Sequence, residues 1–173
     1  MMEDALALSR MDSGGVTFNP APLDVRGFCE RLRDEMHSAT SKKNPIELEV
    51  AQDIDRPLPL DESLLRHILT NLLSNAVKYS ADGSPVHLRV ARTSNGVRFE
   101  VEDHGIGIPE ADRDRLFEAF HRADNVGHVH GTGLGLVIAK RCCDLHGGQL
   151  AFASEDGRGT TFTVILPIAS ISS

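Results

Sequence analysis

Residues 61–79 read DESLLRHILTNLLSNAVKY, and this stretch predicts the helix around which the fold is built. Its apolar residues recur every three to four positions, which is the spacing of one face of an α-helix. They are Leu64, Leu65, Ile68, Leu69, Leu72, Leu73, Ala76 and Val77. A polar set lies beside that face, because its members follow one another at intervals of four, three and one. It comprises Asn71, Asn75, Lys78 and Tyr79.

This polar set has the chemistry of a nucleotide site. An asparagine amide oxygen is a hard ligand that suits magnesium, and Lys78, one turn beyond Asn75, can reach the phosphates of a bound nucleotide. Taken alone, however, asparagines and lysines on a helix are more often its solvated side. On this helix alone, the two interpretations stay open.

C-terminal to this helix, segments 86–90 and 97–101 both alternate apolar with polar residues, and a turn at 94–96 joins them as a β-hairpin. Asp103 has the parity of the inward residues, so its carboxylate points toward the core if the strand continues. An unpaired buried carboxylate is costly, so it needs hydrogen-bond donors, and the exocyclic amine of adenine would serve. A simple Asp-Gly turn is the alternative.

Two groups of glycines predict the close approach of a ligand. Gly105 and Gly107 leave room for a flat ring, and Ile108 supplies apolar contact. The run GTGLGL at 131–136 leads into a helix predicted over 134–145, whose N-terminal amides suit a triphosphate. It lacks the Gly-Lys-Ser/Thr ending of a P-loop and does not follow a first strand, so it supports neither a P-loop nor a dinucleotide-binding fold. For this run a flexible hinge is the alternative.

The rest of the chain predicts short elements of both kinds. Between Ile108 and Thr132 no strand pattern occurs, so we predict a lid over about 109–132 with a short helix at 113–120. The other predicted elements are a helix end at 5–11 closed by Gly14 and Gly15, a short strand at 16–18, an extended connector at 19–22, a helix at 25–40 capped by Asp24, and strands at 46–50, 149–153 and 160–166.

Composition excludes several classes of protein. The 173 residues and the 40% hydrophobic content fit one packed domain. The chain has 25 acidic and 18 basic residues, so its net charge is −7. This balance predicts no broad cationic surface for nucleic acid or anionic lipid. The apolar stretches are too short and too charged for a membrane span or a signal peptide. Three cysteines without a disulfide pattern indicate a reducing compartment, so we expect a cytoplasmic protein.

Five motifs, in this order, resemble those of the histidine-kinase branch of the GHKL ATPases. They are an N box at 71–79, a first glycine box at 103–107, an F box at 116–120, a second glycine box at 131–136 and a glycine-threonine strand at 157–164. The Lys-Tyr ending of the N box and the presence of an F box favour histidine kinases over gyrase-type topoisomerases, mismatch-repair ATPases and the chaperone branch. The resemblance implies an α/β fold, a two-layer sandwich of helices on a mixed β-sheet (the Bergerat fold) with a flexible ATP lid.

The resemblance also implies a role for each motif residue, with ATP and Mg²⁺ as ligands. At the metal and the phosphates it implies Asn75 on magnesium, Asn71 assisting and Lys78 pairing with a phosphate. At the adenine it implies selection by Asp103, with Tyr79, Gly105, Gly107 and Ile108 around the base. The remaining nucleotide-binding residues that it implies are Gly131, Thr132, Gly133, Leu134, Gly135 and Leu136 at the lid hinge, and Thr160. Phe117 and Phe120 are expected to anchor the lid by packing, and Arg122 is a candidate for the γ-phosphate.

The phosphoacceptor of this family is expected to lie on another domain. In histidine kinases it is a histidine followed by an acidic residue and a Leu-Arg-Thr-Pro-like run, and none of the eight histidines here has that setting. Residues 1–15 resemble the end of a preceding dimerisation helix, and 16–173 resemble the catalytic ATP-binding domain. We therefore expect the chain to donate the γ-phosphate of Mg-ATP to a histidine on a separate dimerisation domain, for relay to a response regulator.

We expect this chain by itself to be monomeric and to contact neither nucleic acid nor membrane, whether or not its parent kinase is membrane-anchored. Two alternatives stay open: a degenerate GHKL module that senses nucleotide or binds a partner, and a serine kinase or anti-sigma factor of the same superfamily. The retained Asn75 and Asp103 argue against the first, and the preceding helix argues against the second. We interpret His121, His128 and His130 in the lid as solvated side chains rather than as a zinc or nickel site.

Overall fold

The computed structural model describes residues 2–39, 44–119 and 133–168. Its elements are α1 (Met2–Asp12), β1 (Ala21–Leu23), α2 (Val25–Ala39), β2 (Ile46–Val50), β3 (Leu58–Leu60), α3 (Glu62–Tyr79), β4 (Val86–Arg92), β5 (Gly96–Asp103), the 3₁₀ helix η1 (Glu110–Arg115), α4 (Gly135–Leu145), β6 (Gln149–Glu155) and β7 (Gly159–Pro167).

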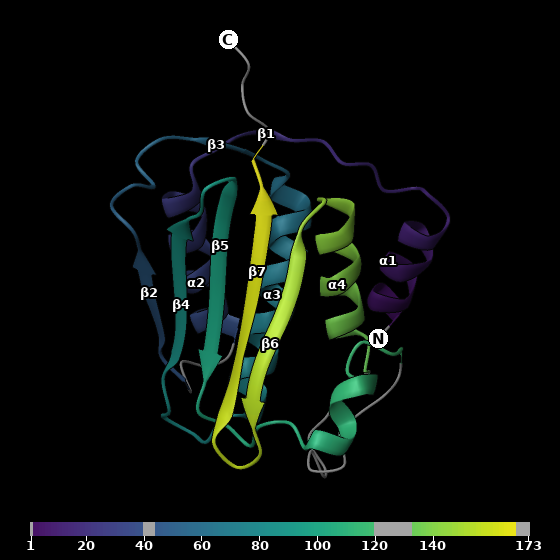
Figure 1. Cartoon of the computed structure of the whole chain (residues 1–173), viewed down its shortest axis with the longest axis vertical. Helices are drawn as coiled ribbons and strands as arrows, with labels where there is room; N and C mark the ends of the chain where they lie inside the picture. The colour runs from purple at the N-terminus through teal and green to yellow at the C-terminus, as the bar shows by residue number, and fades with distance from the viewer. Residues whose placement is uncertain (1, 40–43, 120–132, 169–173) are drawn as a thin grey trace.

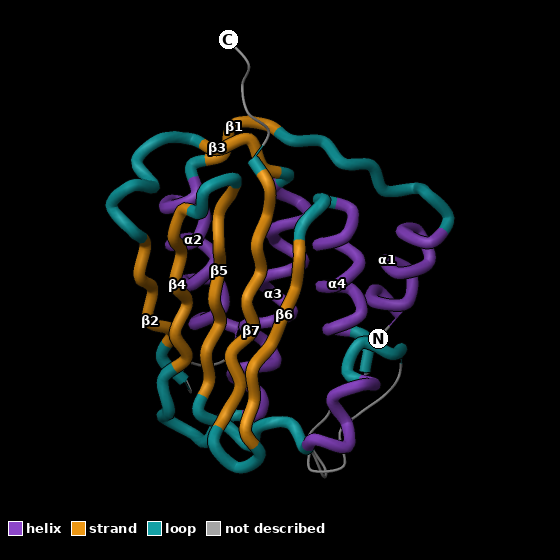
Figure 2. The backbone as a smooth tube through the Cα atoms, viewed as in Figure 1, coloured by secondary structure: helices purple, strands orange, loops and turns teal. Residues whose placement is uncertain are grey.

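The described elements form two layers. The main sheet has the order β2-β4-β5-β7-β6, with β2 and β4 parallel and the other neighbouring pairs antiparallel. Helices α2, α3 and α4 lie against one face of this sheet (Figure 1). Figure 2 shows the same arrangement with helices and strands in separate colours. The predicted fold, helices packed on a mixed sheet, is therefore confirmed.

The core lies between these layers, as the sequence periodicities predict. All eight apolar residues that the helical spacing selects in α3 are buried. Asp61 caps this helix, because its Oδ1 accepts the backbone N–H of Leu64 at 3.0 Å. The inward residues of the hairpin, from Val86 to Val101, are at most 2% exposed. Burying a large aliphatic side chain contributes about 1.5–3 kcal/mol, so packing fixes the position of α3 against the sheet.

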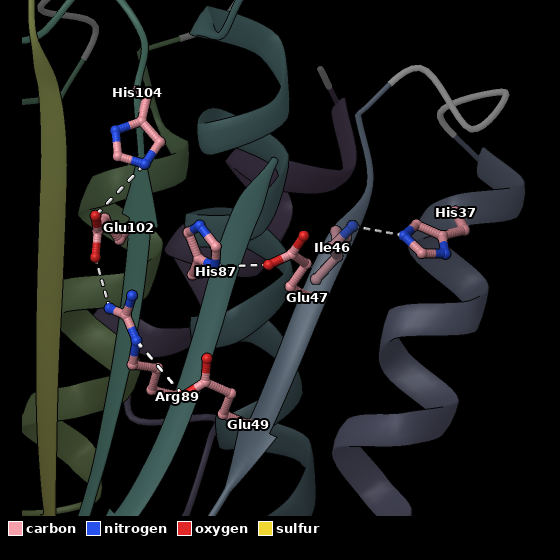
Figure 3. Close-up of polar contacts among 8 residues, drawn as sticks. All are labelled: His37, Ile46, Glu47, Glu49, His87, Arg89, Glu102 and His104. Carbon is pink, nitrogen blue, oxygen red and sulfur yellow. Dashed lines mark hydrogen bonds and ion pairs between the residues drawn. The ribbon is translucent and has the colours of Figure 1, made fainter. Parts of the chain in front are cut away.

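The opposite face of the sheet is polar. Side chains of β2, β4 and β5 form ion pairs across the strands there (Figure 3). Arg89 pairs with Glu102 and lies 3.9 Å from Glu49. His104 Nε2 lies 3.6 Å from Glu102 Oε1, so this ring sits with the polar face although it directly follows Asp103.

The prediction of a strand at 16–18 is wrong. The strand in this part of the chain is β1, which pairs antiparallel with β3, and β3 was not predicted. Pro22 lies opposite Pro59 in this two-stranded sheet. Proline favours extended backbone and lacks an N–H, so it is compatible with a short strand at an edge. The segment predicted as a connector therefore takes part in pairing.

The short helix predicted at 113–120 is misplaced. The structure instead has η1 over Glu110–Arg115, directly after Pro109. Proline pre-sets the backbone for the start of a helix, and Glu110 and Asp112 in the first turn suit its positive end. Residues 120–132, which include the second half of the predicted lid, lie outside the described residues.

Helix α1 lies beside α4 at one side of the molecule (Figure 1). Asp12 and Arg141 form an ion pair of 3.1 Å between the two helices. Gly14 follows α1 with φ at 75°, which confirms the predicted glycine at the end of this helix. Across the described residues, each helix is too short or too polar to cross a membrane.

Candidate functional site

The start of α4 lies against the polar set of α3. Gly135 opens α4, and a Cβ built on it would lie 3.1 Å from Asn71 Oδ1 and 3.8 Å from Asn75 Oδ1. Asn71 donates its Nδ2 to the carbonyl of His67 at 2.7 Å, which orients the amide so that its oxygen faces α4. Two amide oxygens thus face the first residue of a helix. This combination suits a phosphate group that carries a divalent cation.

The residues that lead into α4 fix its first turn. Gly133 has φ at 73°, in the left-handed region that glycine adopts readily. Leu134 is 1% exposed, and its carbonyl accepts the N–H of Ile138 at 2.9 Å. Leu136 is half-buried and packs against the core. The other predicted residues of this region lie outside the described residues: Gly131, Thr132, Phe120, Arg122, His121, His128 and His130.

Asp103 ends β5 with its side chain turned inward, as strand parity predicts. The residue is 8% exposed, and its Oδ1 accepts the backbone N–H of Gly105 at 2.9 Å. Burial raises the pKa of Asp103, while backbone hydrogen bonds from Gly105 and Thr160 partly oppose the rise. The predicted Asp-Gly turn and the predicted buried acid are therefore both present. The carboxylate retains capacity for a further donor.

The two glycines after Asp103 allow the backbone to pass close to other backbone. A Cβ on Gly105 would collide with the carbonyl oxygen of Tyr79, and a Cβ on Gly107 would collide with that of Glu155. Gly107 also has φ at 69°. The sequence predicted room for a flat ring here, and the structure shows that protein backbone already needs this room. Ile108, which follows them, is 8% exposed.

The end of α3 is joined to this glycine segment. The N–H of Ile106 donates to the carbonyl of Tyr79 at 3.3 Å. The Lys78 amine lies 6.0 Å from the centre of the Tyr79 ring, within range of a cation–π contact. The bond to Ile106 brings the end of the predicted N box to the glycines that follow Asp103.

Ser154 and Arg113, which the sequence did not single out, support this site together with the predicted Thr160. Thr160 lies opposite Asp103 in the β5–β7 ladder and is 6% exposed. Ser154, on β6, approaches Thr160 Oγ1 with its own Oγ at 2.9 Å. Arg113 of η1 donates to the carbonyl oxygens of Ser154 and Ile108, at 2.6 and 3.3 Å. The signal for Ser154 was available, because it is a hydroxyl at an inward position of an alternating strand.

Phe117 packs beside the site rather than in it. Its ring centre lies 6.1 Å from that of Phe152, and Phe152 lies 6.0 Å from Phe162 of β7. These edge-to-face and tilted contacts hold the segment after η1 against the sheet. The position agrees with the prediction that Phe117 anchors the lid by packing.

Comparison with known proteins agrees with this geometry. The family described as histidine kinase-, DNA gyrase B-, and HSP90-like ATPase matches residues 60–170, a span that contains the polar set of α3, Asp103, the start of α4 and Thr160. The chain belongs to this family.

The chain is also similar to part of several sensor histidine kinases. It is 37% identical to the circadian input-output histidine kinase CikA of Synechococcus elongatus, over 96% of this chain and 23% of that protein. It is 34% identical to the sensor histidine kinase WalK of Bacillus subtilis, over 96% of this chain and 28% of that protein. The chain thus spans about a quarter of the length of these relatives.

Solved structures of the family have the same fold. Full-length ShkA in complex with AMPPNP superimposes with a TM-score of 0.78 at 31% identity, over 98% of this chain and 35% of ShkA. The mycobacterial sensor histidine kinase MprB gives 0.71 at 28% identity, over 88% of this chain and 98% of that one. Both agreements extend over most of the two-layer fold described above.

Proposed function

We propose that this family member binds ATP with Mg²⁺ between α3 and the start of α4. The observation that carries the proposal is the meeting of Asn71, Asn75 and Gly135, with a buried acid at Asp103 on the neighbouring strand. The amide oxygens and the N–H groups of a helix start fit a metal-bound phosphate chain, so the residues present fit this ligand. That ShkA is known in complex with AMPPNP, an ATP analogue, supports the same ligand class.

Each end of the nucleotide is assigned to different residues. Asp103 is ionised when it accepts the exocyclic amine of adenine, whereas guanine would direct a carbonyl oxygen at it. Asn75 holds the Mg²⁺ ion, with Asn71 beside it, and Lys78 neutralises phosphate charge. Magnesium, when bound, supplies further neutralisation of the phosphates. The N-terminal amides of α4 hold the phosphates in place, which is the main requirement of phosphoryl transfer.

We propose further that the γ-phosphate goes to a histidine on a separate dimerisation domain and from there to a response regulator. The relatives are sensor histidine kinases several times longer than this chain, which supports a partner domain of this kind. Helix α1, packed along α4, is assigned to the end of the preceding dimerisation helix. On this assignment the chain phosphorylates a supplied acceptor and does not phosphorylate itself.

The test has a binding stage and a transfer stage. Titration calorimetry with ATP, with and without Mg²⁺, is expected to show binding for the parent and a large loss for Asn75→Ala and Asp103→Ala. Incubation with γ-labelled ATP and a histidine-containing helical hairpin from a related kinase is expected to label the hairpin with acid-labile phosphate. Absence of ATP binding by the folded parent would refute the proposal, and acid-labile phosphate on this chain alone would refute the assignment of the acceptor.

A further inference from the structure

We propose that Ser154 is a positioning residue that sets the preference of this site for adenine over guanine. It acts through Thr160 and Ile108 rather than by touching the nucleotide. This inference rests on the proposed function, because it concerns how Asp103 and its neighbours recognise the base. Ser154 lies near the end of β6, on the side of the sheet that faces the helices, and is half-buried.

The Ser154 hydroxyl joins three segments. Its Oγ accepts the N–H of Ile108 at 2.8 Å, donates to the carbonyl of Gly159 at 3.0 Å and lies 2.9 Å from Thr160 Oγ1. A serine hydroxyl has a single hydrogen, and the carbonyl of Gly159 can only accept. With the Ser154 hydrogen on the Gly159 carbonyl, the hydrogen between the two hydroxyls comes from Thr160. This leaves Thr160 Oγ1 as an acceptor only.

An acceptor at Thr160 has a direct bearing on base recognition. Thr160 and Asp103 are directly opposed in an antiparallel ladder, so their side chains emerge on the same face, about 5 Å apart at Cβ. The N–H of Thr160 also bonds to the Asp103 carboxylate. Two neighbouring acceptors fit the 6-amine of adenine, which has two hydrogens to donate, whereas guanine in the same orientation presents its 6-carbonyl oxygen, which can only accept. Without Ser154, the Thr160 hydroxyl can rotate and offer its hydrogen instead.

Arg113 fixes the backbone around Ser154. Its Nη2 donates to the Ser154 carbonyl at 2.6 Å and its Nε donates to the Ile108 carbonyl at 3.3 Å. Ile108 is thus held at its N–H by the Ser154 hydroxyl and at its carbonyl by Arg113. These bonds hold the glycine segment that ends at Ile108 against β6. Ser154 contributes to them twice, because its hydroxyl binds the N–H of Ile108 and its carbonyl accepts from Arg113.

The test compares Ser154→Ala with Ser154→Thr, which restores the hydroxyl. Titration calorimetry measures the affinities of both variants and the parent for Mg-ATP and Mg-GTP. We expect Ser154→Ala to bind ATP about three- to tenfold more weakly, the range of one lost hydrogen bond, and GTP no more weakly. The ratio of ATP affinity to GTP affinity is then about three- to tenfold smaller in Ser154→Ala than in the parent. Ser154→Thr is expected to restore most of the parent ratio. Thr163→Val, on the outward side of β7, is the matched hydroxyl control and is expected to keep the parent preference.

A purely structural role of Ser154 would give a different result, because a loosened fold would lower the affinities for ATP and GTP alike. Equal loss for ATP and GTP, or an unchanged preference in folded Ser154→Ala, would overturn the inference. If Ser154→Ala does not fold, Arg113→Met serves instead. It removes the two side-chain hydrogen bonds that η1 makes to Ser154 and Ile108, and an unchanged ATP/GTP preference in this variant would overturn the inference in the same way. Failure of the parent itself to prefer ATP would refute the proposed function.

Discussion

Gly135→Ala separates nucleotide binding from stability. Gly135 is the first residue of α4, and it is absent from the glycines with positive φ, so alanine can adopt its backbone conformation. Alanine is favoured over glycine in a helix by up to about 1 kcal/mol, and it also reduces the entropy of the unfolded chain. The new methyl group would lie 3.1 Å from Asn71 Oδ1, so the amide must shift by a few tenths of an ångström. We therefore expect the free energy of unfolding to stay equal or to rise by at most about 1 kcal/mol.

Nucleotide binding is expected to change in the opposite direction. The methyl group would occupy the place where the two asparagine oxygens meet the start of α4, with Asn75 Oδ1 at 3.8 Å. It would displace the Asn71 amide, whose other end is held by His67, and would keep a phosphate away from the helix N–H groups. We expect at least a tenfold loss of Mg-ATP affinity, which corresponds to about 1.4 kcal/mol.

The assay pairs calorimetric titration with urea unfolding. Gly83→Ala is the control, because it is expected to have the opposite pattern of effects on stability and on binding. Gly83 has φ at 83° with open space around its would-be Cβ, so alanine there strains the backbone by about 1 kcal/mol without touching the site. That variant is expected to lose stability and to keep ATP affinity. If Gly135→Ala is folded and binds Mg-ATP as tightly as the parent, then the start of α4 does not hold the phosphates and the reasoning fails.

Three further predictions concern titrating groups. Since burial raises the pKa of Asp103 above its ordinary 3.8, its contribution to stability is present below 3.8 and is lost as pH rises through the folded pKa. Asp103→Asn should therefore unfold no more easily than the parent at pH 7 in urea, yet lose at least tenfold in ATP affinity. Arg89 lowers the pKa of Glu102, so Arg89→Met should cost at most about 1 kcal/mol, chiefly above pH 4.5, with ATP titrations unchanged. Burial raises the pKa of Cys142 to about 12, so a thiol reagent at pH 8 should label it only after unfolding.

The helical and strand periods predicted most of the fold because one face of each long element is buried. In α3 the apolar spacing selected the residues that are in the core, and in β5 parity alone placed Asp103 inward. Periodicity carries no such information for β1 and β3, which are three residues each. Periodicity also cannot predict that Gly105 and Gly107 lie against the backbone of other segments, because the residues that they contact belong to α3 and β6. Contacts between distant segments decide these details.

The two helices that frame the site are joined at their far ends. The N–H of Asp61, the cap of α3, donates to Nε2 of His146 at the C-terminal end of α4, at 3.0 Å. Burial lowers the pKa of His146, which keeps the ring neutral and able to accept this bond. Asp61 Oδ2 also accepts the N–H of Asn19, from the segment after α1. The start of α3 and the end of α4 are thus fixed to each other and to the incoming chain. At the start of α4, Gly135 faces Asn71 and Asn75 with no side chain of its own between them, which is the arrangement that the proposed phosphate site requires.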